Sequence, residues 1–225
     1  MNIAIDGPAG AGKSTLARAL ARKLGFLYID TGAMYRALTW KALQKGLDLC
    51  DASALSALAS STDIHFETKA GIQWLNCDGM DVTQVIRSPE VSAAVSKTAS
   101  HSAVREIMVR KQQLMAQTSN VIMDGRDIGE IVLPDAEFKF FLTASLDERA
   151  QRRALEMKSQ GYQINDKSIK KDIQNRDRMD SERNVGALKI LADSIVIDTG
   201  QLGVDEVLEQ ILSIIGEGYN ALLHS

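Results

Sequence analysis

Eight residues near the start of the chain, from Gly7 to Ser14, fit the pattern G-x-x-x-x-G-K-[ST] of a phosphate-binding loop. A short apolar run that ends in Asp6 precedes them, and a stretch with strong helix propensity follows them. Glycines let successive backbone N–H groups turn inward around phosphate oxygens at the positive end of a helix. Lys13 would reach the β- and γ-phosphates of a nucleotide, and the Ser14 hydroxyl would hold Mg²⁺. The residues of this expected loop are Gly7, Pro8, Ala9, Gly10, Ala11, Gly12, Lys13, Ser14 and Thr15.

A second group of candidate residues follows a hydrophobic run between Asn120 and Asp124. An acid at the end of a buried strand is the minimal form of a residue that supports the magnesium ion of such a loop. Strand-terminal aspartates are common, so this signal is weak by itself. The neighbouring residues add to it, because Gly125 allows a ligand to approach Arg126 and Asp127 closely.

Arginine is the other residue type whose spacing indicates phosphate chemistry. Phosphoryl transfer spreads negative charge over equatorial oxygens, to which arginines donate planar, bidentate hydrogen bonds. The alternative is a solvated helix face held by i,i+4 ion pairs. Both interpretations stay open for Arg149, whereas a phosphate role is favoured for Arg153, Arg176 and Arg183. Two sets share a helix face: Arg149, Arg152 and Arg153, and further along Arg176, Asp180 and Arg183.

These residues need a scaffold, and strands alternate with helices around the glycine-rich loop. The alternation predicts a parallel α/β sheet flanked by helices, with an active site at the carboxyl ends of the strands. The expected strands are 3–6, 26–29, 120–124, 137–143 and 194–198. The expected helices follow the loop to Leu24 and then cover 30–45, 51–60, a region beginning near 89, 103–117, 146–158 and 204–215.

Two segments depart from this alternation. Residues 63–68 and 72–77 flank Lys69-Ala70-Gly71 and predict a hairpin, with Val82 on a short third strand. We interpret this region as an antiparallel insertion beside the core. The stretch 167–183 is polar nearly all round, which suits a mobile helical flap better than a packed core helix.

Composition limits the class of protein. The chain has 225 residues, of which 45% are hydrophobic and 24% charged, the profile of an ordinary globular protein. A net charge of −3 argues against a bulk nucleic-acid binder. Cys50 and Cys77 form no C-x-x-C motif, so neither zinc nor a disulfide framework is indicated. With no signal peptide and no long apolar run, we expect a cytoplasmic protein without a membrane partner.

Taken together, these motifs resemble those of the bacterial cytidylate kinases, members of the nucleoside monophosphate kinase family. The combination of Asp-[ST]-Gly-Ala-x-Tyr-Arg with Asp-Gly-Arg-Asp is specific to this subfamily. Thr31 stands where the family often has Ser, which leaves a hydroxyl group in place. The resemblance runs through nearly the whole chain and rests on residues 5–15, 30–36, 124–129 and 176–183.

The resemblance implies roles for individual residues and a division of the chain. Its parts would be a core formed by 1–30, 118–150 and 190–225, a monophosphate-binding region over 31–117 with a β insertion near 63–83, and a lid over 155–187. The implied contacts are Arg36, Arg126 and Arg183 with the phosphate of CMP; Ser96, Arg105 and Asp127 with the cytosine ring; Arg176 and Asp180 near the sugar and the transferred phosphate; Thr31 with the nucleotide; and Arg152 or Arg153 with the base of ATP.

Hydrogen-bonding chemistry independently supports recognition of cytosine by these residues. Cytosine offers an exocyclic amino donor together with O2 and N3 acceptors. A carboxylate such as Asp127 accepts from the amino group, while Arg105 and Ser96 can donate to the acceptors. Uracil places a carbonyl oxygen where the amino group was, so it faces the carboxylate unfavourably, at a cost of about 1–3 kcal/mol.

We therefore expect transfer of the γ-phosphoryl group of ATP to CMP or dCMP with Mg²⁺, with Lys13, Arg126, Arg176 and Arg183 as catalytic residues. One alternative is a kinase for another small acceptor such as UMP or shikimate, against which Asp127 and the insertion weigh. Another is a nucleotide-binding switch, but the chain has neither an N-K-x-D guanine reader nor an acid pair after the fourth strand. A monomer is expected, because no long apolar stripe is left over.

Overall fold

The computed structural model describes residues 1–69, 72–159, 161 and 166–223 of the chain. It divides into two compact units. Unit 1 comprises Met1–Tyr28 and Ser119–Ser225, and unit 2 comprises Ile29–Thr118.

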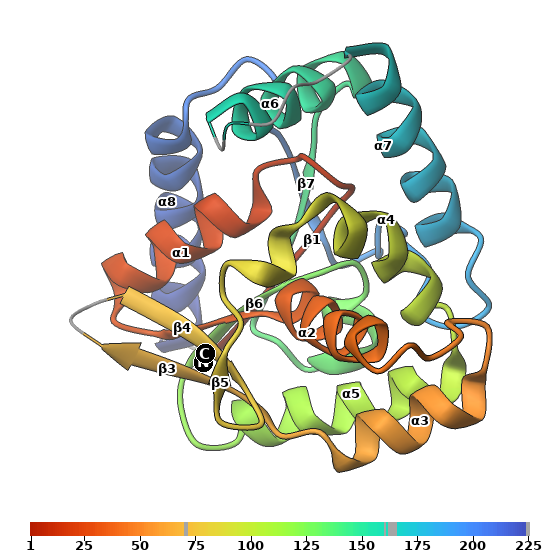
Figure 1. The fold of residues 1–225 in the computed structure, drawn as a ribbon. Coiled ribbons are helices and arrows are strands. Elements are labelled where there is room, and N and C mark those ends of the chain that lie inside the picture. Colours follow the sequence, from red (N-terminus) through yellow and green to blue (C-terminus); the bar gives the residue numbers. More distant parts are fainter. Residues whose placement is uncertain (70–71, 160, 162–165, 224–225) are drawn as a thin grey trace. The chain divides into compact units, whose positions relative to one another are not determined.

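A five-stranded parallel sheet is the centre of unit 1, as the alternation of strands and helices predicts (Figure 1). Its order is β2-β6-β1-β7-β8, so β1 lies in the middle with β6 and β7 on either side. In this register Ile5 lies opposite Asp124, and Thr143 lies opposite Asp198. The ends of β1 and β6 therefore meet at one edge of the sheet. The strands are β1 (Asn2–Asp6), β2 (Leu27–Asp30), β6 (Val121–Asp124), β7 (Phe138–Thr143) and β8 (Ile195–Asp198).

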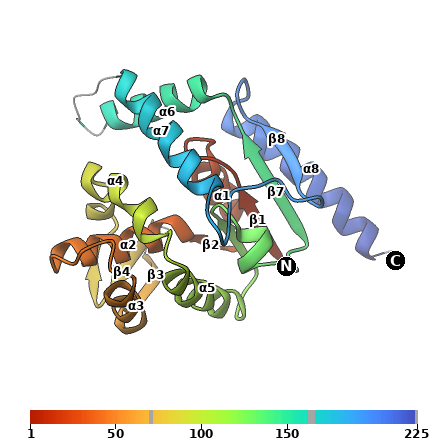
Figure 2. The ribbon, with the colours of Figure 1, turned by 90° about the vertical axis from the view of Figure 1, so that its right-hand side faces the viewer.

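Helices α1 (Lys13–Leu24) and α8 (Val204–Leu223) cover one face of this sheet. Figure 2 shows α8 running along β7 and β8. Their apolar sides close over a core that burial of hydrocarbon stabilises. The α8 helix continues beyond its expected end near 215, and its Gly218 lies close to Phe138: a Cβ at Gly218 would come within 2.8 Å of that ring. Core residues at this face include Ile3, Ile5, Leu20, Ile122, Phe140, Ile197 and Ile211.

Helices α6 (Leu146–Ser159) and α7 (Asp166–Ser181) pack against each other and form a separate small core. Ile169 and Ile173 are buried there and contact Ala154. The segment 167–183, expected to be a flap, therefore has one face that packs against α6. Two isoleucines at i,i+4 spacing supply a narrow apolar stripe among the charged residues. The segment 160–165 of the expected lid lies, except for Gly161, outside the described residues.

Unit 2 contains helices, a 3₁₀ turn and an antiparallel sheet of order β3-β4-β5. The hairpin is confirmed, and its turn residues Ala70 and Gly71 lie outside the described residues. The third strand is Met80–Asp81, so Val82 follows it instead of belonging to it. The elements are α2 (Thr31–Gln44), α3 (Ala52–Ser61), β3 (Ile64–Lys69), β4 (Ile72–Cys77), β5 (Met80–Asp81), η1 (Val85–Arg87), α4 (Pro89–Thr98) and α5 (Ser102–Ala116).

Local signals explain where several helices begin and end. The carboxylate of Asp30 accepts a hydrogen bond from the Ala33 N–H at 2.7 Å and caps α2. Asp51 caps α3 in the same way, and the Ser88 hydroxyl caps α4 ahead of Pro89. Gly25 ends α1 in the left-handed conformation, φ 71°.

Among the described residues, no helix is both long enough and apolar enough to cross a membrane.

Candidate active site

The glycine-rich loop connects the end of β1 to the start of α1, the position expected of a phosphate-binding loop. Gly10 and Gly12 have φ of 80° and 85°, which glycine adopts without the strain that a side chain adds. Gly7 lies against the neighbouring strand, where a Cβ would come within 2.1 Å of the Leu142 carbonyl oxygen. These positions therefore require glycine for backbone reasons.

Lys13 begins α1 and lies within this loop. Its side chain is buried, and Nζ donates a 2.8 Å hydrogen bond to the Pro8 carbonyl oxygen. Burial lowers the pKa of Lys13, and the positive charge of Arg126 lowers it further. Phosphate groups bound at the loop would raise the pKa of Lys13 again, because their negative charge stabilises its charged form. The site is therefore suited to an anionic ligand.

Ser14 and Asp124 lie together, as the idea of a shared magnesium site requires. The Ser14 hydroxyl donates to Asp124 Oδ2 at 2.8 Å, and the Tyr28 hydroxyl donates to Oδ1 at 2.8 Å. Both acceptor oxygens belong to a buried carboxylate at the end of β6. Hydroxyl and carboxylate oxygens are the ligands that Mg²⁺ prefers, so these residues fit that ion.

Asp6, at the end of β1, has a structural role beside the loop. It accepts hydrogen bonds of 2.9 Å from the backbone N–H groups of Ile128 and Gly129, which begin the π-helical turn η2 (Ile128–Val132). Burial raises the pKa of Asp6 to about 6, although these two hydrogen bonds act in the opposite direction. Asp6 thereby ties the turn after β6 to the base of the loop.

Arg149 supports the loop from α6. Its guanidinium donates to the carbonyl oxygens of Ala9 at 3.0 Å and Ala144 at 3.1 Å, and it forms an ion pair with Asp177. Asp177 in turn accepts from the Ala9 N–H at 3.3 Å. Arg149 is only 7% exposed, so the interpretation of this residue as part of a solvated helix face is wrong. It positions the loop.

Arg152 and Arg153 are neighbours in sequence but have different environments. Arg152 donates to Thr199 Oγ1 at 2.9 Å, and the Thr199 hydroxyl donates to the Ala11 carbonyl oxygen at 3.1 Å. Arg152 thus lies beside the loop, close to Gly12. Arg153 pairs with Glu156 at 2.7 Å on the surface of α6. Of these two candidates, Arg152 is the one that adjoins the loop.

Asp180 organises two of the expected catalytic arginines. Arg126 Nε donates to Asp180 Oδ2 at 2.7 Å, and Arg183 donates to Oδ1. Burial alone would raise the pKa of Asp180, but the adjacent guanidinium groups of Arg126, Arg183 and Arg176 lower it. The sequence predicts that Arg176, Asp180 and Arg183 share one helix face. In the structure α7 ends at Ser181, so Arg183 reaches Asp180 from the segment that follows the helix.

Asp127 precedes η2 and is 7% exposed. Its side chain does not cap that turn, since the N–H groups of Ile128 and Gly129 bond to Asp6. The Arg126 Nε donates to Asp180.

In unit 2, Arg36 lies over the beginning of its own helix. Its Nη2 is 3.2 Å from both carboxylate oxygens of Asp30, the cap of α2. Gly32 leaves room for this arrangement, because a Cβ there would come within 3.2 Å of Arg36 Nη1. Thr31, the first residue of α2, is buried.

The residues expected to read a base also belong to unit 2, except Asp127. Arg105 of α5 is 3% exposed, and its guanidinium carbon lies 5.7 Å from the centroid of the Tyr35 ring. It donates to the Ala99 carbonyl oxygen at 3.4 Å. Ser96 of α4 is buried as well. Buried hydrogen-bonding groups of this kind can discriminate between ligands, because a ligand that leaves them unpaired binds less well.

Sequence reasoning missed several residues that support these groups. Thr199 and Tyr28 carry no motif, and only the parallel pairing of distant strands brings them to the loop. Arg87 of η1 lies 3.9 Å from Asp30 Oδ2, beside Arg36. The local signal for Arg87 is the pair Ser88-Pro89 that follows it. This pair is typical of a helix start and fixes the backbone next to Arg87.

Comparisons with known proteins agree with this geometry. The family model described as "Cytidylate kinase" matches residues 3–217. Cytidylate kinases from Shouchella clausii (strain KSM-K16) and Pelotomaculum thermopropionicum are each 51% identical to this chain, the match covering 96% of both proteins in each case. A solved structure of an uncharacterized protein from Eubacterium ventriosum has a TM-score of 0.52 at 14% identity, covering 96% of this chain and 98% of that one, and bears on the fold alone. The chain belongs to the cytidylate kinase family.

Proposed function

We propose that this chain catalyses transfer of the γ-phosphoryl group of ATP to the 5′-phosphate of CMP or dCMP. The bond between the γ-phosphorus and the β,γ-bridging oxygen breaks, and a bond to an acceptor phosphate oxygen forms, giving ADP and CDP or dCDP. The observation that carries this assignment is the family match over residues 3–217, which includes every residue of the candidate site.

The donor nucleotide binds to the glycine-rich loop of unit 1. The loop N–H groups contact the phosphates, Lys13 reaches the β- and γ-phosphates, and Arg152 lies against the base of ATP. Ser14 and Asp124 would hold Mg²⁺, which neutralises charge on the phosphates when bound. The 2.8 Å contact between their oxygens supports this role.

The acceptor nucleotide has its own set of expected contacts. Arg36, Arg126 and Arg183 bind its phosphate, while Ser96, Arg105 and Asp127 bind the cytosine ring. Thr31, Arg176 and Asp180 complete the expected set, with Asp180 near the sugar. Burial of Ser96, Arg105 and Asp127 supports a role in discrimination, because buried polar groups tolerate few alternative partners.

Catalysis requires positioning and charge stabilisation more than proton transfer. The attacking phosphate oxygen is already ionised at neutral pH, so a strong general base is unnecessary. Arginines near the transferring group stabilise the charge that accumulates on its equatorial oxygens. We infer that residues 155–187 act as a lid that brings Arg176 and Arg183 to the phosphates and excludes water.

Arg183→Ala and Arg176→Ala are expected to lower kcat more than they raise the KM for ATP. Contacts made only in the transition state act mainly on kcat. Arg178, an exposed arginine of α7, provides the matched control Arg178→Ala, for which steady-state constants close to wild type are expected. Unchanged kcat in both active-site variants would contradict the lid proposal.

The function is tested by measuring ADP release with CMP, dCMP, UMP, AMP and shikimate as acceptors. We expect CMP and dCMP to have the highest kcat/KM. A preference for UMP or shikimate would replace the acceptor assignment, and ADP release that needs no acceptor would indicate an ATPase or a nucleotide switch instead.

We further propose that the enzyme works as a monomer in the cytoplasm, where ATP and CMP are available together. The sequence leaves no long apolar stripe outside the expected core, which supports a monomer. A sedimentation measurement at the enzyme concentration used for kinetics tests this point, since a dimer under those conditions would contradict it.

A further inference from the structure

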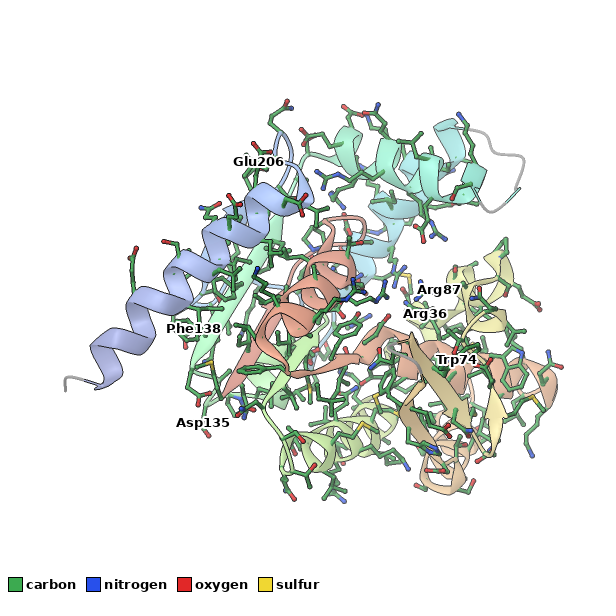
Figure 3. The ribbon with its side chains drawn as sticks, turned by 90° about the vertical axis from the view of Figure 1, so that its left-hand side faces the viewer. Arg36, Trp74, Arg87, Asp135, Phe138 and Glu206 are labelled. Atoms are coloured by element: carbon green, nitrogen blue, oxygen red, sulfur yellow. The ribbon has the colours of Figure 1, made fainter. Side chains whose placement is uncertain are left out.

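Two arginines of unit 2 share one carboxylate. Arg36 Nη2 lies 3.2 Å from both oxygens of Asp30, and Arg87 Nη2 lies 3.9 Å from Oδ2. Figure 3 shows the labelled side chains of Arg36 and Arg87 next to each other. The cluster therefore contains more positive than negative charge, and Asp30 neutralises only one of the two guanidinium groups.

The guanidinium groups of the two arginines differ in whether they donate hydrogen bonds to Asp30. A separation of 3.9 Å is too long for a hydrogen bond, so Asp30 attracts Arg87 without taking up its donors. The Arg87 side chain is 35% exposed, compared with 15% for Arg36. Arg87 can thus present its planar set of N–H donors to a further anion, which is the geometry that suits a phosphate group.

The backbone around Arg87 is held on both sides. Before it, the buried Val82 donates its N–H to the Leu75 carbonyl oxygen at 2.9 Å, which attaches the segment to β4. The Thr83 hydroxyl oxygen accepts from the Leu75 N–H at 2.8 Å. After it, Ser88 caps α4. The position of Arg87 is therefore determined by the antiparallel sheet and by α4 together.

This support extends through η1 itself. The Ile86 side chain is 1% exposed, and the Arg87 N–H donates to the Gln84 carbonyl oxygen at 3.0 Å. Because the backbone at Arg87 is already held, no backbone freedom has to be lost there when its side chain binds a ligand, which favours affinity.

We propose that Arg87 binds the phosphate group of the acceptor nucleotide beside Arg36, and that the three-stranded insertion serves to position it. The inference rests on the proposed function, because the acceptor phosphate is expected at Arg36. It assigns the insertion a part in substrate binding through a residue that no motif of the chain includes.

The test is Arg87→Gln, with Arg87→Lys as the conservative variant and Arg110→Gln, an exposed arginine of α5, as the matched control. Loss of a charge-assisted hydrogen bond should raise the KM for CMP about 10-fold, with the KM for ATP within about twofold of wild type. Arg87→Lys keeps the charge but not the planar donors and should give an intermediate value. Thermal unfolding of each variant verifies that it is folded.

Comparison of acceptors separates the phosphate from the rest of the nucleotide. Because CMP, dCMP and UMP share the 5′-phosphate, Arg87→Gln should raise their KM values by the same factor. Cytidine, which lacks the phosphate, should inhibit wild type and variant with the same constant. A change in the CMP/UMP ratio, or a weaker inhibition by cytidine, would overturn the phosphate assignment.

Two further outcomes keep this inference distinct from the proposed function. If the wild type phosphorylates CMP while Arg87→Gln leaves the KM for CMP unchanged, the role of Arg87 is wrong and the kinase assignment stands. If the wild type does not phosphorylate CMP, the proposed function is wrong, and the inference about Arg87 fails with it.

Discussion

Lys13→Ala is expected to reduce phosphorylation of CMP by roughly 10²–10³-fold, the loss typical of removing a charge-stabilising donor. Lys13 places a positive charge where the β- and γ-phosphates of ATP bind, and alanine cannot replace it. The effect should appear mainly in kcat, because charge on the phosphates redistributes in the transition state. Steady-state kinetics with CMP and ATP measure it.

The folded state should survive this substitution. Lys13 is buried, and burial together with Arg126 lowers its pKa, so its charge is not a net source of stability in the absence of nucleotide. Its hydrogen bond to the Pro8 carbonyl is lost, at a cost of about 1 kcal/mol. Lys23→Ala, at the exposed far end of α1, is the control. A Lys13→Ala protein that melts normally and retains more than about a tenth of wild-type activity would contradict the role of the loop.

Much of the fold follows from short-range patterns in the sequence. The glycine-rich loop, the Asp30 and Ser88 caps and the Gly25 stop all act on backbone within a few residues, so their effects are visible locally. The change from helical to alternating periodicity likewise predicts the hairpin over β3 and β4.

The supports of the site could not be predicted in this way, because they join distant parts of the chain. Asp177 accepts from the Ala9 N–H across 168 positions of sequence. Arg149 has the spacing of a surface residue, and only the packing of α6 beside the loop makes it buried. The strand order of the sheet decides such contacts, and no local pattern records that order.

Helix α7 illustrates a different difficulty. Ile169 and Ile173 lie among charged residues, so the average polarity of the segment conceals a stripe that is two residues long. Asp177 follows at the same helical spacing and bonds to Arg149. The polar composition therefore described the exposed faces of α7 correctly and missed the face that packs against α6.

Asp127→Asn is expected to shift the CMP/UMP ratio of kcat/KM by roughly 10–100-fold toward UMP, as a contact of about 1–3 kcal/mol predicts. A carboxylate only accepts hydrogen bonds, so it favours the exocyclic amino group of cytosine over the carbonyl oxygen of uracil. A carboxamide can also donate, which weakens the rejection of UMP. The 7% exposure of Asp127 means that solvent does not supply a substitute partner. Kinetics on CMP, dCMP, UMP and AMP measure the shift.

The alternative for Asp127 is a purely structural role, and the structure makes that role testable. Asp180 already accepts from the Arg126 Nε at 2.7 Å, and Asp6 already bonds the N–H groups of Ile128 and Gly129. If Asp127 only supported its surroundings, Asp127→Asn would lower activity on every acceptor by the same factor. Asp135→Asn, at an exposed position before β7 (Figure 3), is the control for loss of a carboxylate. An unchanged CMP/UMP ratio would leave phosphoryl transfer intact and remove Asp127 as the cytosine reader. Discrimination between the two bases requires a group that hydrogen-bonds to the amino group of cytosine and is repelled by the carbonyl oxygen of uracil.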